Sequence, residues 1–310
     1  MYHTHLDMTC LFLAGHRTND HRYLNVQRHI FRKLLLVGHK VMNACKDRIG
    51  KSQDIYDIPK VILWSAPRCV STAFERSIRE LEGIKVYHEL YTSAAYLGEE
   101  RFYPRYNEKT VPNSKFSDVR LQLESTVIGY KGIFAKEHAY AVPETRRKDA
   151  LPDGYRHTFL IRMPRKSVTS LCRATPKTDD PGWPTVYDGE IGICELFELF
   201  KFIGDSTGET PLVIDADDLL NDPATMMKKY CDCVGFEFKE SMLHWEAGPV
   251  DDWDYEGDWY GTVINSTGLS KPSQREEAEP DVSTLPQHVQ DLIQQAEPCY
   301  QAMYKLRMKP

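Results

Sequence analysis

Short apolar runs alternate with amphipathic stretches along most of this 310-residue chain. Five runs have the length of buried strands, and they span residues 61–64, 84–87, 127–134, 158–161 and 212–214. Apolar residues at helical spacing follow several of these runs, as in residues 71–78 and 192–203. Strands that alternate with helices predict an α/β fold, a three-layer sandwich in which helices flank a central, mostly parallel sheet.

The first 55 residues differ in composition from the rest of the chain. They hold six of the eleven histidines, and apolar residues recur at helical spacing over residues 28–43. We therefore predict an N-terminal extension over residues 1–55, with one amphipathic helix, and a main domain over residues 56–310. The histidines are scattered, which favours solvated side chains over a metal site.

Charge and composition exclude several classes of partner. Hydrophobic residues make up 41% of the chain and charged residues 27%, as in an ordinary soluble domain. The net charge of −6 argues against nucleic-acid or membrane-surface binding, because either partner requires a basic face. No signal peptide and no apolar stretch of transmembrane length is evident. We therefore expect a cytoplasmic protein whose eight cysteines are reduced.

A polar loop joins the first predicted strand to the helix after it, with the sequence Ser-Ala-Pro-Arg-Cys-Val-Ser-Thr at residues 65–72. The first amides of a helix have no partner within the helix, and its dipole favours an anion there. Arg68 adds a permanent cation, and Ser71 and Thr72 add hydroxyl donors. The loop lacks the glycines and the lysine of a kinase-type phosphate loop, which disfavours an ordinary ATPase or kinase.

A second cluster of the same kind follows the fourth predicted strand. Arg162 stands at the end of that strand, and Ser170 lies on the helix after it. Open α/β sheets bind ligands at the carboxyl ends of their strands. Two sites for phosphate-like groups at this end predict a ligand with two separated anionic groups.

Together, these clusters resemble the nucleotide-binding elements of sulfotransferases that use 3′-phosphoadenosine 5′-phosphosulfate (PAPS), which have a phosphate-loop-like α/β fold. The first family element commonly has the sequence P-K-S-G-T-T, and residues 67–72 stand in its register with Arg68 in place of the lysine. The second element, R-x-P-x-x-x-x-x-S, is matched by Arg162, Pro164 and Ser170. The resemblance implies that Arg162 and Ser170 bind the 3′-phosphate. It implies that the 5′-phosphosulfate is bound by Arg68, Cys69, Val70, Ser71 and Thr72.

Two departures set this chain apart from the phenol and steroid enzymes of the family and indicate a divergent soluble branch. Ala73 and Phe74 stand where a tryptophan often stacks on adenine, and the glycine-rich C-terminal element is absent. Ser270 and Lys271, in a glycine-bearing basic loop, are candidates to close over the nucleotide instead. An ordinary surface loop is the alternative.

Sulfuryl transfer requires a base near the acceptor, cations near the leaving oxygens and a pocket that excludes water, but it does not require a metal. The resemblance identifies Lys136 and His138 as the family's K-x-H element, in which the histidine is the base. Glu89, at the end of the second strand, is the alternative base or orients the acceptor. Strand alternation would direct His88 away from Glu89. Arg68 and Lys136 would supply the positive charge.

Other polar groups support weaker hypotheses. The insertion after the second strand would form a lid over the acceptor or a solvated face, with cations and aromatic residues at Arg101, Phe102, Tyr103, Arg105, Tyr106, Lys115 and Arg120. Residues 248–279 are predicted to form loops over the site. We expect Asp215 and Asp217 to cap a helix, and Cys231 and Cys233 to be two thiols at a helix end, so no metal site is predicted.

The sequence therefore predicts a PAPS-dependent sulfotransferase that acts on a hydroxyl, or secondarily an amine, of a small-molecule acceptor. In this prediction residues 56–310 are the nucleotide-binding catalytic domain, with no nucleic-acid or membrane partner. One alternative is a nucleotide-dependent phosphotransferase, a kinase of similar architecture. Another is a non-catalytic nucleotide-binding protein that kept the fold.

Overall fold

The computed structural model describes residues 58–104, 106, 110–175, 187–253, 259–270 and 281–310. The predicted extension over residues 1–55 lies outside the described residues. The rest contains a five-stranded sheet with the order β2-β3-β1-β4-β5, in which every pairing is parallel. The strands are β1 (Lys60–Ser65), β2 (Ile84–His88), β3 (Gly132–His138), β4 (Arg156–Ile161) and β5 (Leu212–Asp215).

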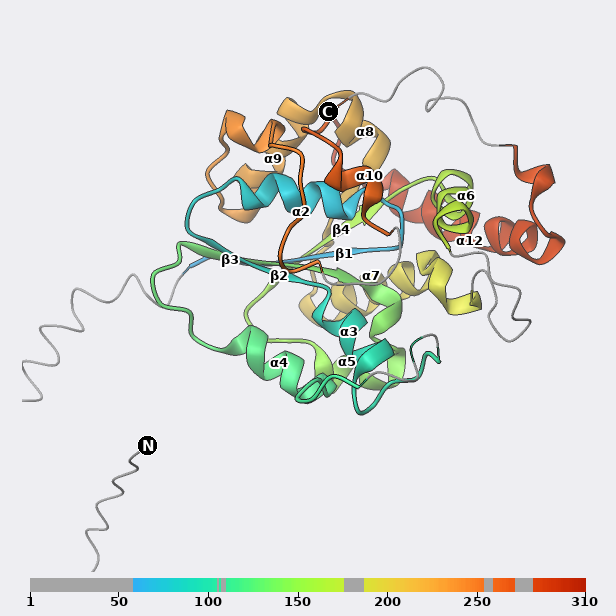
Figure 1. The fold of residues 1–310 in the computed structure, drawn as a ribbon, viewed down its shortest axis with the longest axis horizontal. Coiled ribbons are helices and arrows are strands. Elements are labelled where there is room, and N and C mark those ends of the chain that lie inside the picture. Colours follow the sequence, from blue (N-terminus) through green and yellow to red (C-terminus); the bar gives the residue numbers. More distant parts are fainter. Residues whose placement is uncertain (1–57, 105, 107–109, 176–186, 254–258, 271–280) are drawn as a thin grey trace, which may run out of the picture. The chain divides into compact units, whose positions relative to one another are not determined.

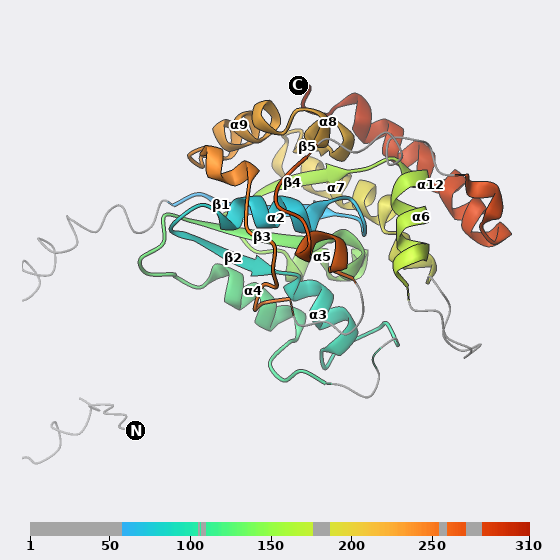
Figure 2. The ribbon, with the colours of Figure 1, turned by 45° about the horizontal axis from the view of Figure 1, so that its top comes forward.

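Helices cover both faces of this sheet, so the predicted three-layer α/β sandwich is confirmed (Figure 1). One face carries α2 (Ser71–Arg79), α8 (Ala216–Asn221) and α9 (Pro223–Val234). The other carries α3 (Leu90–Leu97), α4 (Phe116–Glu124), α5 (Glu144–Ala150) and α7 (Ile193–Thr207). Figure 2 shows α6 (Pro164–Ala174) and α12 (Gln287–Lys305) together at one side, where α12 packs against α6 and α7.

The central strand shows why the sheet is buried on both sides. In β1, the run from Val61 to Trp64 is fully buried, and it is continuously apolar rather than alternating. This pattern is typical of a parallel strand between two layers of helices. Phe74 of α2 packs into the same core against Phe134 and Tyr230, so it offers no exposed ring to a ligand.

The third strand begins five residues later than its apolar run predicted. Residues 127–131 are not in a strand: Gly129 has a φ of 86°, and Ile128 is 82% exposed. The positive φ ends any extended conformation at this point, and of the two apolar residues before it Ile128 is exposed and Val127 is half-buried. At its other end β3 stays paired with β1 through His138, so the predicted catalytic residues belong to the strand instead of following it.

The buried His157 makes the free energy of unfolding of the domain depend on pH. Its Nδ1 accepts a hydrogen bond from the Trp64 indole at 2.9 Å, which requires a neutral ring, and burial lowers its pKa from 6.5 to about 4. The unfolded chain therefore binds this proton more readily, and stability is lost as the pH falls from about 6.5 to about 4, by at most about 3 kcal/mol. Denaturant titrations across this range should show a flatter profile for His157→Gln, which keeps an acceptor for the indole. An unchanged profile would contradict this role.

Candidate active site

Two helix N-termini lie side by side at the carboxyl end of the sheet, the end at which all five strands finish. Neighbouring strands β1 and β4 lead into α2 and α6, and the register pairs Ser65 with Leu160 just before the two loops. The residues that precede these helices, Val70 and Met163, form no side-chain cap. Their first-turn amides therefore create two adjacent regions of positive potential, which suit a ligand with two anionic groups.

The predicted phosphate-binding side chains meet between these two helices. Arg68 Nε donates to Ser170 Oγ at 3.2 Å, and Arg162 Nη1 donates to the Arg68 carbonyl oxygen at 3.0 Å. Within the described part of the chain, the buried Arg162 Nε has no hydrogen-bond partner, and Thr169 Oγ1, one residue before Ser170 on α6, has none either. Since a buried donor without a partner is costly, this cluster retains hydrogen-bonding capacity that an oxyanion can satisfy.

The two aspartates after β5 have different roles. Asp215 accepts hydrogen bonds from the amides of Asp217 and Asp218 at 3.0 and 3.2 Å, which confirms it as a helix cap. The same prediction for Asp217 was wrong. Its carboxylate binds Lys166 Nζ at 2.8 Å and lies 4.0 Å from Arg162 Nε, because the sheet brings the ends of β4 and β5 together. Asp217 thus lies beside the cluster of Arg68, Arg162 and Ser170, which we call the anion cluster because it is predicted to bind an anion.

The loop from β1 to α2 has an unusual backbone conformation. Arg68 and Val70 have φ values of 63° and 69°, in the left-handed region that only glycine adopts at no steric cost. Such residues cost about 1–3 kcal/mol each and concentrate at ligand sites. Cys69 is fully buried, and burial raises the pKa of its thiol to about 12, so the thiol is unsuited to act as a nucleophile. Ser71 is buried and Thr72 half-buried at the helix start.

The predicted base, His138, forms a buried cluster with Lys136 and Glu89, which we call the base cluster. It lies on the β3 side of β1, whereas β4 lies on the other side. Lys136 Nζ is ion-paired with Glu89 Oε1 and lies 3.3 Å from His138 Nε2, which in turn lies 3.1 Å from Glu89 Oε1. On the far side of the ring, His138 Nδ1 lies 3.2 Å from Ser65 Oγ. The register of the sheet explains this arrangement, because His138 pairs with Ser65 and Lys136 pairs with His88.

The charges in this cluster set the protonation state of the base. Burial, and then the Lys136 cation, lower the pKa of His138 below its ordinary value of 6.5, although the Glu89 carboxylate acts in the opposite direction. For Glu89, burial raises the pKa, but the Lys136 and His138 charges outweigh it and hold the pKa well below 4.5. At neutral pH, therefore, Glu89 is an anion and His138 is a neutral imidazole able to accept a proton.

A kink at the end of β2 presents Glu89 to this cluster. Glu89 has a φ of 47°, and the next two amides, of Leu90 and Tyr91, donate to the Glu137 carboxylate at 2.8 and 3.1 Å. Because the chain leaves the extended conformation here, the alternation predicted for His88 was wrong. His88 Nε2 lies 3.8 Å from Glu89 Oε1, and its Nδ1 lies 2.5 Å from the buried Glu75 Oε2.

The segment predicted to cover the site does reach it. The Trp259 carbonyl oxygen accepts from Arg68 Nη1 at 2.7 Å, and the Tyr260 hydroxyl lies 2.9 Å from His88 Nε2. After these residues, α10 (Gly261–Ile264) lies beside the start of α2, where Val263, Tyr260 and Trp253 pack with Ala73 (Figure 1). Ser270 is exposed, and Lys271 lies outside the described residues, so their contact with a nucleotide stays a prediction.

The cations and the aromatic residues of the insertion after β2 have different surroundings. Lys115 pairs with Glu99, and Arg120 pairs with Glu124 and Asp153, in exposed or partly exposed ion pairs. Arg101 donates to Thr110, and Arg105 lies outside the described residues.

Three tyrosines lead toward the predicted base, His138: Tyr96 lies on α3, Tyr103 in the insertion and Tyr140 directly after β3. Tyr140 stacks on His138 with ring centroids 5.6 Å apart, Tyr103 lies 5.6 Å from Tyr140, and Tyr96 stacks on Tyr103 at 4.9 Å. We call Tyr96, Tyr103 and Tyr140 the tyrosine wall. Tyr103 is the member of the wall that was among the predicted lid residues, and it reaches His138 through Tyr140.

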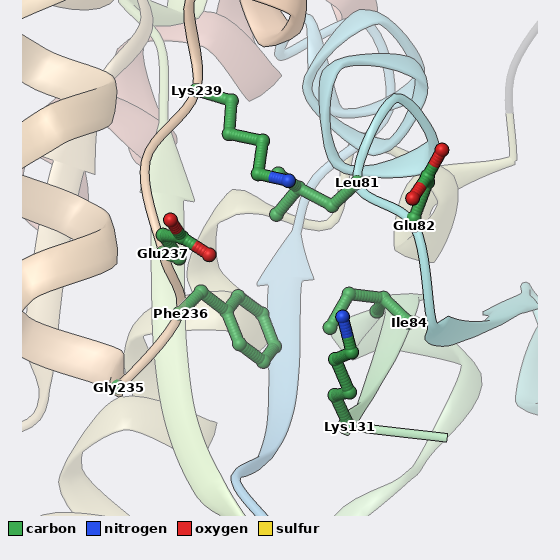
Figure 3. A pocket seen from close by; sticks show the side chains of 8 residues that line it. All are labelled: Leu81, Glu82, Ile84, Lys131, Gly235, Phe236, Glu237 and Lys239. Carbon is green, nitrogen blue, oxygen red and sulfur yellow. The ribbon is translucent and has the colours of Figure 1, made fainter. Parts of the chain in front are cut away.

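A pocket at the other end of the sheet is not part of this site. Figure 3 shows Phe236 and Leu81 facing each other across it, with Lys131 and Lys239 on opposite sides. It lies where β2 and β3 begin, since Ile84 opens β2 and Lys131 precedes β3. Ligands of open α/β sheets bind where the strands end, which favours the carboxyl end.

The described residues give no sign of a metal centre or a membrane span. They contain no group of three or more His, Cys, Asp or Glu residues able to hold a metal ion. Cys231 and Cys233 both lie on α9 close to its end, as predicted. The first is buried and the second is exposed. No helix in this part of the chain combines the length and the apolar character needed to cross a membrane.

Sequence reasoning missed several groups around the predicted ones. Ser65, Glu137 and Tyr140 contact or support the base cluster, and Glu75 holds His88. Ser65 and Glu137 do adjoin predicted site residues in the sequence, and a buried carboxylate at the end of an apolar strand is a usable signal. The link between Glu75 and His88 joins α2 to β2, and no local pattern indicates it.

A parallel, doubly wound α/β domain with an uncapped helix start after its first strand defines the phosphate-loop-like α/β fold class. Within that class, the chain belongs to the sulfotransferase family, whose domain model matches residues 59–307. The divergent membership predicted from the sequence is thereby confirmed.

A solved structure supports the fold, and the curated relatives match this chain over only part of their own length. The branched-chain-amino-acid aminotransferase-like proteins 1 and 2 of Arabidopsis thaliana are 30% and 28% identical over 78% and 76% of this chain. The chain spans only 41% and 40% of their lengths. Among solved structures, the sulfotransferase domain of the Synechococcus PCC 7002 olefin synthase is 15% identical with a TM-score of 0.50, covering 78% of this chain and 97% of that domain. This likeness shows a shared fold.

Proposed function

We propose that this chain transfers a sulfuryl group from PAPS to a hydroxyl of a small molecule, with an amine as the second choice of acceptor. The observation that carries the proposal is one of placement. The Arg68, Arg162 and Ser170 cluster and the buried His138, Lys136 and Glu89 cluster flank the same loop at the carboxyl end of the sheet. One cluster suits anion binding, and the other suits proton transfer.

The residues present fit a nucleotide with phosphate groups at both ends of its ribose. The two uncapped helix starts are adjacent, and the buried Arg162 Nε has no hydrogen-bond partner in the described part of the chain. By the family motif, Arg162 and Ser170 would bind the 3′-phosphate. The 5′-phosphosulfate would be held by Arg68, Cys69, Val70, Ser71 and Thr72, which supply amides, hydroxyls and one guanidinium.

Each member of the base cluster has a distinct part in the proposed transfer. When bound, PAPS supplies an electron-poor sulfuryl group on an anionic leaving group. His138 takes the proton from the acceptor hydroxyl, and the Glu89 carboxylate stabilises the imidazolium that results. Lys136 and Arg68 offset the negative charge that develops on the leaving oxygens. Burial of the cluster excludes water, which strengthens these interactions.

The tyrosine wall points to the kind of acceptor. Tyr140 covers one face of His138, and Tyr103 and Tyr96 continue the aromatic surface away from it. Tyr96 and Tyr140 are buried, so the half-buried Tyr103 is the member of the wall with ring surface open to an acceptor, in the offset stacked or edge-on geometry that aromatic rings favour. We therefore propose an acceptor that presents an apolar face beside its reacting hydroxyl.

Thermal unfolding with ligands tests the binding half of the proposal. At about 100 times its Kd, 3′,5′-adenosine bisphosphate should raise the Tm by roughly 5–10 °C, because a ligand that binds only the folded state stabilises it by mass action. Adenosine 5′-phosphosulfate, which lacks the 3′-phosphate, should raise the Tm less. Equal or larger stabilisation by ATP with Mg²⁺ would favour a phosphotransferase instead. Incubation with radiolabelled PAPS and a panel of hydroxyl and amine acceptors then identifies what receives the sulfate.

A further inference from the structure

Two thiols meet at the contact between α7 and α12, away from the candidate active site. Cys194 lies in the first turn of α7 and Cys299 in the second half of α12, 105 residues later, yet their Sγ atoms are 3.1 Å apart. Both are free and half-buried. The two helices pack against each other along this contact, so the pair is held together by the fold.

We propose that Cys194 and Cys299 form a reversible disulfide that joins α7 to α12. An S–S bond is about 2.05 Å long, so the sulfur atoms must approach by only about 1 Å, which side-chain rotation and small helix shifts permit. A metal site is a poorer explanation, because tetrahedral sites require further ligands. The described residues offer no group of three such ligands here or elsewhere.

The oxidant that balances the reaction is a small-molecule disulfide such as oxidised glutathione. The thiolate of one cysteine attacks this disulfide, forms a mixed disulfide and releases one glutathione thiolate. The second cysteine thiolate then attacks the protein sulfur of the mixed disulfide and releases the second glutathione. Two electrons pass from the cysteine pair to glutathione, and the two thiol protons leave to solvent. A small thiol reverses both steps.

The surroundings of the pair predict slow exchange. Burial, together with the Cys299 thiol beside it, raises the pKa of Cys194 to about 12, so the reactive thiolate is scarce at neutral pH. Cys194 Sγ also lies 3.7 Å from the Gln295 carbonyl oxygen, which accepts from its S–H. Oxidation therefore requires long equilibration, and the test below allows for that.

The crosslink would join two helices that both support the carboxyl end of the sheet. Gly192, two residues before Cys194, has a φ of 70° and lies so close to the loop that a Cβ there would be 3.2 Å from Pro67 Cδ. On α12, the Tyr300 hydroxyl donates to Asp215 Oδ2 at 3.1 Å. A bond between Cys194 and Cys299 would therefore fix two elements relative to each other. One is α7, whose start lies close to the loop after β1, and the other is α12, which contacts the end of β5.

The test equilibrates the full-length chain overnight with oxidised or with reduced glutathione and then blocks the remaining thiols. Peptide mapping without reductant should show a linked pair of peptides carrying Cys194 and Cys299, with two hydrogens lost, and dithiothreitol should release them. The oxidised form should melt roughly 5–15 °C higher, because the bond closes a long loop in the unfolded chain. Cys299→Ser should lose both effects. Cys172→Ser, at another half-buried thiol, should keep both.

Three outcomes would overturn the proposal. These are glutathione adducts on Cys194 or Cys299 without a link between them, a link between other cysteines, and a linked form that melts at the same temperature as the reduced form. Because the mapping uses the unaltered chain, a misfolded variant cannot decide the result.

Discussion

Replacing His138 by glutamine should lower kcat by about 10²–10⁴-fold, the usual contribution of a positioned general base. In the unaltered chain, Ser65 Oγ and Glu89 Oε1 lie 3.2 and 3.1 Å from the ring nitrogens of His138. A glutamine side chain can still form hydrogen bonds with both, but it cannot act as a base. The Kd for 3′,5′-adenosine bisphosphate should change by less than about threefold, since the base cluster is separate from the anion cluster. Steady-state sulfuryl transfer and calorimetric titration measure the two effects.

The matched control is His288→Gln, at an exposed histidine near the start of α12, which should leave both values unchanged. If His138→Gln turns over normally, the base is Glu89, and Glu89→Gln should then show the loss instead. A loss of bisphosphate affinity as large as the loss of kcat would mean that His138 acts through binding or folding.

The pH dependence of kcat/KM in the unaltered enzyme follows from the same charges. A general base acts when deprotonated, so activity falls as the pH drops through its pKa. Because burial and Lys136 lower the pKa of His138, this fall should lie below the ordinary histidine value of 6.5. A fall centred well above that value would contradict the assignment.

Arg162→Ala should weaken binding of 3′,5′-adenosine bisphosphate by about 10- to 100-fold, which corresponds to the loss of charged hydrogen bonds to one phosphate. The buried Arg162 Nε has no hydrogen-bond partner among the described residues, and the side chain also braces the Arg68 carbonyl oxygen at 3.0 Å. Affinity for adenosine 5′-phosphosulfate, which lacks the 3′-phosphate, should fall much less. Calorimetric titration with both ligands separates these effects.

Arg173→Ala provides the matched control, because this exposed arginine lies in the last turn of the same helix, far from its N-terminus. It should bind both ligands as the unaltered chain does. Equal losses for both ligands in Arg162→Ala would indicate that Arg162 shapes the loop through Arg68 and does not contact a 3′-phosphate.

Local signals predicted the strand–loop–helix units that carry Arg68, Arg162 and Ser170. The strand that ends at Ser65 holds the apolar run at residues 61–64, the strand before Arg162 ends in the apolar run at residues 159–161, and each leads through a short loop into a helix. In a parallel α/β sheet such loops share one end, so the sequence places Arg68, Arg162 and Ser170 at the same end of the sheet. Their contact depends on β1 and β4 being neighbours, which the structure shows. The third strand was less predictable, because Val127 and Ile128 are apolar but precede the turn at Gly129.

The surroundings of His138 were harder to predict, because they depend on contacts between strands that are far apart in the sequence. The contact between His138 and Ser65 depends on the register between β1 and β3, and that of Lys136 with Glu89 depends on the kink at Glu89. The role of Asp217 depends on the adjacency of β4 and β5. None of these pairings leaves a periodic pattern in the sequence.

What the sequence by itself determined is the set of strand–loop–helix units and the chemistry that each carries. Apolar periodicity and helix-start residues act over a few neighbours, so they are legible in one dimension. What only the tertiary structure decided is which units are adjacent: β3 beside β1, which brings His138 to Ser65, and α12 against α7, which brings Cys299 to Cys194. Such contacts join residues far apart in the chain, and the packing of the whole sheet and its helices selects them.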